Sequence, residues 1–146
     1  MAAQAASTQT RKTTTFKDAK AFSSFSVNNL DKAKAFYGET LGLQISELPE
    51  GLQLKLAGGT TTFLYPKPNH TPASFTVLNF PVNDIEASVE ELNRLGVTLE
   101  RYDLPDLKTD EKGIMRGPGP QIAWFKDPAG NILSVVQDRR DADSRA

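Results

Sequence analysis

The stretch FSVNNLDKAKAFYGETLGLQI, residues 25–45, has a second version further along the chain, FPVNDIEASVEELNRLGVTLE, residues 80–100. With a shift of 55 residues, apolar and capping residues align in pairs: Phe25/Phe80, Val27/Val82, Asn28/Asn83, Asn29/Asp84, Leu30/Ile85 and Asp31/Glu86. After a one-residue deletion, Gly42 aligns with Gly96. Self-similarity of this kind indicates one supersecondary unit that is present twice.

Each copy reads as a strand, a helix and further strands. Asn29 and Asp84 are good N-caps, and Gly42 and Gly96 favour the left-handed backbone that ends a helix. Strand candidates then follow the first helix as LQISEL, LQLKLA and TTFLYP, and the second as VTLERY, QIAWFK and ILSVVQ. The order βαβββ, twice, predicts an α+β fold in which two curved mixed sheets surround a shared concave cavity.

The last strand begins at a well-formed turn, DPAGN, residues 127–131. The Asp127 carboxylate is suited to accept a backbone N–H two or three residues on, and Gly130 to take the positive φ. The strand that follows is apolar except for Ser134. A hydroxyl at this position of an apolar strand is expected to have either a functional or a structural role.

Composition sets the domain organisation. We expect a flexible N-terminal tail over residues 1–18, a single domain over 19–137 with repeats at about 19–67 and 74–137, and a flexible C-terminal tail over 138–146. The near balance of 17 Lys+Arg against 18 Asp+Glu, without a basic block, argues against nucleic acid. No apolar run reaches the length of a membrane span, and the absence of cysteine excludes thiol chemistry. We expect a cytoplasmic protein with no membrane partner.

The opening FSVNNLDKAKAFYGETLGL, its echo VNDIEASVEELNRLGV and the closing WFKDPAGNILSVVQ together resemble the vicinal oxygen chelate superfamily. This superfamily includes glyoxalase I, bleomycin-resistance proteins and extradiol dioxygenases, and the resemblance covers about residues 20–137. It implies two βαβββ units around a cavity and a homodimer, because open sheets leave edges and a face that a second copy can cover.

The resemblance also implies where a metal would bind. Members with metal chemistry place His or Glu on the first and last strands of each unit, and these positions correspond here to Phe22, Phe63, Val77 and Ser134. None of these side chains is an imidazole, carboxylate or thiolate. The sequence therefore predicts no metal and no other cofactor. We expect His70, in the PKPNHTP linker, to be solvated.

Strand alternation places neutral polar residues beside these positions, as in a small-molecule pocket. The candidate ligand-binding residues are Ser24, Tyr65, Asn79, Arg116, Trp124 and Ser134. Arg116 and Trp124 together would clamp an anionic or planar ligand.

Three functions remain open. The first is metal-free binding of a largely apolar or aromatic ligand in the cavity between the repeats. The second is a metal-independent enzyme that acts on a small metabolite in the same cavity, with catalytic residues unknown. The third is a metal-dependent lyase or dioxygenase whose ligands lie near the positions named above, for which Glu47 and Glu100 come closest.

Overall fold

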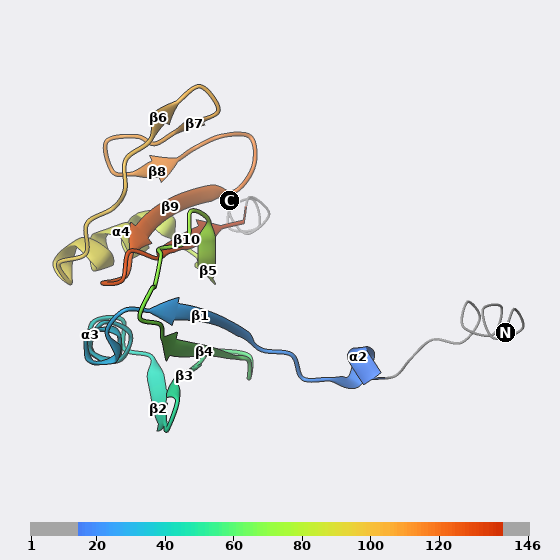
Figure 1. The fold of residues 1–146 in the computed structure, drawn as a ribbon. Helices are drawn as coiled ribbons and strands as arrows, with labels where there is room; N and C mark the ends of the chain where they lie inside the picture. The colour runs from blue at the N-terminus through green and yellow to red at the C-terminus, as the bar shows by residue number, and fades with distance from the viewer. Residues whose placement is uncertain (1–14, 139–146) are drawn as a thin grey trace, which may run out of the picture.

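The computed structural model describes residues 15–138. Its elements are α2 (Thr15–Asp18), β1 (Ser23–Val27), α3 (Leu30–Lys34), η1 (Ala35–Thr40), β2 (Gln44–Leu48), β3 (Gly51–Lys55), β4 (Thr61–Pro66), β5 (Thr76–Pro81), α4 (Ile85–Arg94), β6 (Asp103–Leu104), β7 (Leu107–Lys108), β8 (Ile114–Met115), β9 (Gln121–Lys126) and β10 (Ile132–Gln137). Within these residues, no helix is long and apolar enough to cross a membrane. The predicted tails lie outside the described residues except for Asp138 and α2, a helical turn displaced from both sheets (Figure 1).

Each repeat forms a four-stranded mixed sheet, with strand orders β1-β4-β3-β2 and β5-β10-β9-β8. β1 runs parallel to β4 and β5 runs parallel to β10, while the remaining neighbours in both sheets are antiparallel. Figure 1 shows the two sheets as separate bodies that follow one another along the chain. The predicted α+β class with two βαβββ units is confirmed.

The helices begin where their caps predict. The Asn29 side chain accepts a hydrogen bond from the backbone of Lys32, and the Asp84 side chain accepts one from Ala87. The first helix then widens into η1, a π-helix that closes with a bond from Leu41 N–H to the Phe36 carbonyl. A π turn accommodates one extra residue in a helix. It therefore explains the one-residue difference between the repeats at Gly42 and Gly96.

The prediction that VTLERY is a strand is wrong. Leu99 makes one isolated bridge to Phe125, and Glu100 N–H bonds to the Trp124 carbonyl at 2.8 Å. The chain then leaves the sheet, forms the β6–β7 hairpin, and returns as β8 beside the other end of β9. The second strand of the second repeat is thus divided, because residues 100–113 lie between the Leu99 bridge and β8.

One face of each sheet is buried under its helix. Alternate strand residues fill this core together with apolar residues of the helices: Phe25, Val27, Ala33, Tyr37, Leu52, Leu54, Leu64, Leu78, Ile85, Val89, Leu92, Ala123, Phe125, Leu133 and Val135. The other face, which we call the open face, carries the intervening residues. Because side chains alternate along a strand, this division fixes which residues can meet a ligand.

The predicted DPAGN turn forms and also joins the repeats. The Asp127 carboxylate, only 5% exposed, accepts bonds from Ala129 N–H at 2.9 Å, Asn131 N–H at 2.8 Å and the Asn131 side chain at 3.1 Å. The Tyr37 hydroxyl, from the first repeat, donates to the same carboxylate at 2.7 Å. The Asn131 amide in turn donates to the Ser26 carbonyl at 2.8 Å. Burial of this carboxylate is compensated by hydrogen bonds from both repeats.

Candidate ligand-binding site

The pairing of the parallel strands shows which open-face residues of the two repeats occupy equivalent positions. Ser24 lies beside Phe63 in the first sheet, and Asn79 lies beside Ser134 in the second. Ser24 and Asn79 are also the pair that the 55-residue shift aligns. Phe63 and Ser134 are therefore equivalent positions in the two repeats, as the sequence comparison predicted.

A metal does not fit these positions. Phe63 and Val77 are half-buried hydrocarbon side chains, and Phe22 is 66% exposed just before β1. Ser134 is a neutral hydroxyl, so the four positions offer no anionic or imidazole donor. Among residues 15–138, no group of three or more His, Cys, Asp or Glu residues could hold a metal ion.

The two glutamates nearest to the metal positions are engaged elsewhere. Glu47 forms an ion pair with Lys34 at 2.8 Å, and Glu100 forms one with Lys126 at 3.6 Å. Glu47 also lies opposite buried Leu52, so it belongs to the helix side of the first sheet. A one-residue shift of the alignment therefore does not restore a set of metal ligands.

The open face of the first repeat is an aromatic surface. The rings of Phe63 and Tyr65 are nearly parallel, at 18°, with centroids 6.2 Å apart. Ser24 lies beside Phe63 on β1, and Gln53 lies opposite Phe63 on β3. Gln53 escaped the sequence analysis, because its place beside Phe63 depends on the pairing of two strands. This face offers ring surface with a few neutral polar groups at its border.

The open face of the second repeat is built on hydrogen bonds. The Ser134 hydroxyl donates to Asn79 Oδ1 at 2.5 Å, and Trp124 Nε1 donates to the Thr76 hydroxyl at 3.1 Å. Because β10 lies between β9 and β5, the Trp124 indole crosses β10 to reach Thr76. Ser134 beneath is fully buried, whereas Asn79 is exposed. Tyr102 packs edge-on against Trp124, with ring centroids 5.5 Å apart.

Arg116 holds a loop in place. Its Nε donates to the Asp110 carboxylate at 2.7 Å, and its guanidinium lies 3.6 Å from Glu86 on α4. Burial alone would raise the pKa of Asp110, but hydrogen bonds from Arg116 and from two backbone N–H groups outweigh it and lower that pKa. The guanidinium thus ties the loop before β9 to α4, which differs from the predicted role of ligand clamp.

The expectation that His70 is solvated is wrong. Its Nδ1 lies 2.7 Å from the Ser26 hydroxyl and its Nε2 lies 2.9 Å from the Ala129 carbonyl. A carbonyl can only accept, so Nε2 carries a proton, and in the neutral imidazole Nδ1 accepts from the Ser26 hydroxyl. The linker histidine therefore bridges β1 of the first repeat to the DPAGN turn of the second, a role that needed both partners to be located.

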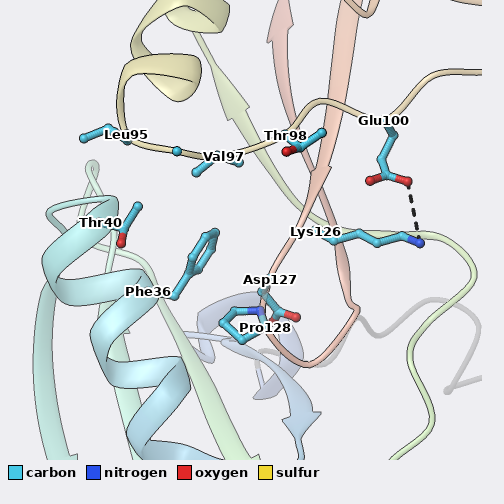
Figure 2. Close-up of a pocket in the computed structure, with 10 residues that line it drawn as sticks. Phe36, Thr40, Leu95, Val97, Thr98, Glu100, Lys126, Asp127 and Pro128 are labelled. Atoms are coloured by element: carbon cyan, nitrogen blue, oxygen red, sulfur yellow. Dashed lines mark ion pairs between the residues drawn. The ribbon is translucent and has the colours of Figure 1, made fainter.

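A cavity of about 350 Å³ lies between the repeats, away from the six predicted ligand-binding residues. Its walls are the side of η1, the segment after α4, and the turn between β9 and β10 (Figure 2). Phe36 and Pro128 form apolar walls, and Lys126 is paired with Glu100 at one edge of it. The buried carboxylate at its edge, Asp127, already accepts four hydrogen bonds. This cavity lies where the repeats pack, and its charged groups, Glu100, Lys126 and Asp127, already have partners.

A family profile matches most of the chain. The profile of the Glyoxalase/Bleomycin resistance protein/Dioxygenase superfamily aligns with residues 21–135. No curated protein sequence matches the chain significantly. The match spans both repeats, from the residue before Phe22 to the residue after Ser134.

Solved structures share the fold. TnmS3, an antibiotic binding protein from Streptomyces sp. CB03234, is 27% identical, with a TM-score of 0.60 over 82% of this chain and 97% of that one. A glyoxalase/bleomycin resistance protein from the same organism is also 27% identical, with a TM-score of 0.55 over 80% and 100% of the two chains. Lactoylglutathione lyase from Agrobacterium tumefaciens is 23% identical, with a TM-score of 0.59 over 82% and 92%. The last likeness concerns the fold alone.

Proposed function

The chain belongs to the glyoxalase/bleomycin resistance protein/dioxygenase superfamily, and we propose that within it this protein binds a small, largely apolar or aromatic molecule without a metal. The observation that carries the proposal is the chemistry of the open faces. They hold aromatic rings, amides and hydroxyls, the composition of a small-molecule site. The likeness to an antibiotic binding protein supports the same reading. The cytoplasmic location stays a prediction.

The lack of acidic residues on the open faces limits the charge of the ligands that they can bind. Among the strands β1 to β5 and β8 to β10, the only acid is Glu47, and it lies on the helix side. A cationic ligand would therefore find no carboxylate on the open faces to pair with. Neutral or anionic planar molecules fit this surface best.

We propose that the site is completed by a second copy of the chain. The hydrogen bonds from Tyr37 to Asp127, from Asn131 to the Ser26 carbonyl and from His70 to Ser26 and Ala129 link the repeats through the DPAGN turn and the linker. The open faces with Tyr65 and Asn79 are left half-exposed or exposed. Exposed aromatic surface of this kind is stabilised when a partner covers it. Sedimentation at micromolar concentration should give a homodimer, and a monomer would contradict this arrangement.

Ligand binding is tested with fluorene-2-carboxylate, a planar aromatic anion. The indole N–H resonance of Trp124, the one tryptophan in the sequence, reports on the second open face without assignment of other signals. We expect the probe to shift this resonance saturably and Phe63→Ala to weaken binding severalfold. Lys34→Ala, which changes a surface ion pair on the helix side, serves as the control and should leave the affinity unchanged.

Metal dependence is tested on the same sample. Treatment with EDTA should leave the affinity for the probe unchanged, and metal analysis should find no stoichiometric zinc or nickel. Stoichiometric metal together with loss of binding after EDTA would overturn the metal-free proposal. A probe that leaves the Trp124 resonance unmoved at millimolar concentration would count against the open faces as a site for planar ligands.

A further inference from the structure

The open face of the second repeat holds a carboxamide that is anchored from beneath. Ser134 is fully buried and donates its hydroxyl to Asn79 Oδ1 at 2.5 Å, while Asn79 itself is exposed. We propose that Ser134 is a positioning residue that holds the Asn79 oxygen against the sheet and turns the NH₂ group toward the ligand. The site then selects planar ligands that carry a carbonyl or similar acceptor. This inference rests on the proposed function.

The length of the hydrogen bond supports this orientation. Bonds between two oxygens cluster near 2.7 Å and extend down to 2.5 Å, whereas N–H···O bonds cluster near 2.9 Å. The 2.5 Å separation between Ser134 and Asn79 therefore fits the carboxamide oxygen, not its nitrogen, as the atom beside the hydroxyl. The carboxamide nitrogen, Nδ2, is bonded to the same planar carbon and points away from the Ser134 hydroxyl. Its two N–H groups are the part of Asn79 left for a ligand.

The burial of Ser134 strengthens its hydrogen bond to Asn79. Ser134 is 0% exposed, and it lies between Trp124 on β9, whose indole donates to Thr76, and Asn79 on β5. Water therefore does not compete for the Ser134 hydroxyl, and the bond to Asn79 holds the carboxamide in one orientation. The hydroxyl that interrupts the apolar strand thus serves the ligand through Asn79.

The first repeat provides the contrast that defines the ligand. At the equivalent positions it has a ring, Phe63, in place of Ser134 and a hydroxyl, Ser24, in place of the Asn79 carboxamide, so its open face offers mainly ring surface. A ligand with a flat apolar body and a hydrogen-bond acceptor on its edge satisfies both halves. A ligand that carries only donors would leave the Asn79 N–H groups unpaired, which is costly once water is excluded.

The test compares two probes that differ by one carbonyl. Fluorene-2-carboxylate and 9-fluorenone-2-carboxylate share ring system and charge, and only the second has an acceptor at position 9. By isothermal titration calorimetry, the full-length protein should bind the fluorenone about fivefold to tenfold more tightly, the range that one net hydrogen bond supplies. The fluorenone should also move the Asn79 side-chain NH₂ resonances, and the fluorene should not.

Three variants test whether Ser134 positions the Asn79 carboxamide or only stabilises the fold. Asn79→Asp keeps the shape and the Ser134 bond but presents an oxygen to the ligand, so the preference should reverse. Ser134→Ala should reduce the preference to about twofold or less, with fluorene affinity nearly unchanged, because the carboxamide is freed to rotate. Ser23→Ala is the matched control: it removes a hydroxyl bonded at 3.0 Å to Thr62 on a neighbouring parallel strand of the first repeat. It should leave the preference intact.

The outcomes distinguish this inference from the proposed function. Equal binding of the two probes by the parent protein, or a preference that persists in Ser134→Ala, would overturn the role of Ser134 while leaving ligand binding in place. A merely structural serine would weaken both probes alike in Ser134→Ala and leave their ratio unchanged, which also counts against the inference. Failure of both probes to bind at millimolar concentration would overturn the proposed function and this inference together.

Discussion

The first repeat has a longer helix and an unbroken second strand, whereas the second repeat has a regular helix and a divided strand. In the first, η1 takes up one extra residue before Gly42 as a π turn. In the second, α4 is regular, and residues 100–113 separate the bridge at Leu99 from β8. Both differences lie outside the pairing of the two central strands. Neither difference changes which of these strand residues share a face.

The register of the parallel strands is what the two repeats keep in common. Ser24 meets Phe63 in one sheet and Asn79 meets Ser134 in the other, at matching positions. The side chains around these positions nevertheless differ. The first repeat has a stacked aromatic pair, Phe63 and Tyr65, and the second has an amide, Asn79, that is hydrogen-bonded to Ser134. The comparison teaches that one backbone plan supports two unlike halves of a site.

The largest expected effect is on the free energy of unfolding. It compares Ser134, which is fully buried, with its equivalent Phe63, which is half-exposed. Ser134→Glu should lower the free energy of unfolding by about 3 kcal/mol or more, because it places an unpaired carboxylate where the side chain is fully buried. Phe63→Glu, at the half-exposed equivalent, should cost less than about 1.5 kcal/mol. Urea denaturation of both variants measures the difference.

Neither glutamate should create a metal site. Phe22 and Val77 still supply no donor, and one carboxylate does not hold a divalent ion. Stoichiometric zinc binding by Ser134→Glu at undiminished stability would show that the four positions have been misassigned.

The next effect concerns the link between the repeats. Burial, and then the charge and hydrogen bond of Asp127, raise the pKa of Tyr37 well above its ordinary value. In the unfolded chain Tyr37 ionises at about pH 10, so above that pH the unfolded state loses a proton that the folded state keeps. The contribution of Tyr37 is complete below pH 10 and declines at about 1.4 kcal/mol per pH unit above it.

Tyr37→Phe removes this dependence. Denaturation from pH 9 to pH 11.5 should show a shallower loss of stability for the variant than for the parent. Its stability at pH 8 should be lower than that of the parent by about 1 kcal/mol, from the lost bond to Asp127. Identical slopes for the two proteins would show that Tyr37 is not shielded from solvent.

The smallest expected effect compares the turns before the last strands. Gly59 and Gly130 have φ values of 87° and 84°, so alanine at either is strained by about 1 kcal/mol. At Gly59 an added Cβ meets nothing within 4 Å, whereas at Gly130 it would lie 2.9 Å from Pro72 Cγ. Gly130→Ala should therefore cost about 1 kcal/mol more than Gly59→Ala. Equal melting temperatures for the two variants would contradict the close approach of Pro72.

Local features were predictable because their partners are near in sequence. The N-caps Asn29 and Asp84, the positive φ of Gly42 and the bond from Ala129 N–H to Asp127 each involve residues within a few positions. Strand alternation also placed Ser24, Asn79 and Ser134 on the open faces, since a period of two follows from the backbone alone. It did not place Thr76 there, because the pairing of β10 with β5 shifts register between Ile132 and Leu133. The failed strand VTLERY shows the limit, because its composition says nothing about where β8 would pair.

The sequence by itself determined the repeat, the βαβββ order and the lack of metal donors at the four family positions, and it placed part of each open face by strand alternation. Tertiary structure decided the partners of the polar residues. Ser134 lies 55 residues from Asn79, His70 lies 44 from Ser26, and Tyr37 lies 90 from Asp127. Hydrogen bonds need atoms within about 3 Å, a condition that local propensity does not encode. The chemistry of this site therefore depends on how the two sheets and their linker pack.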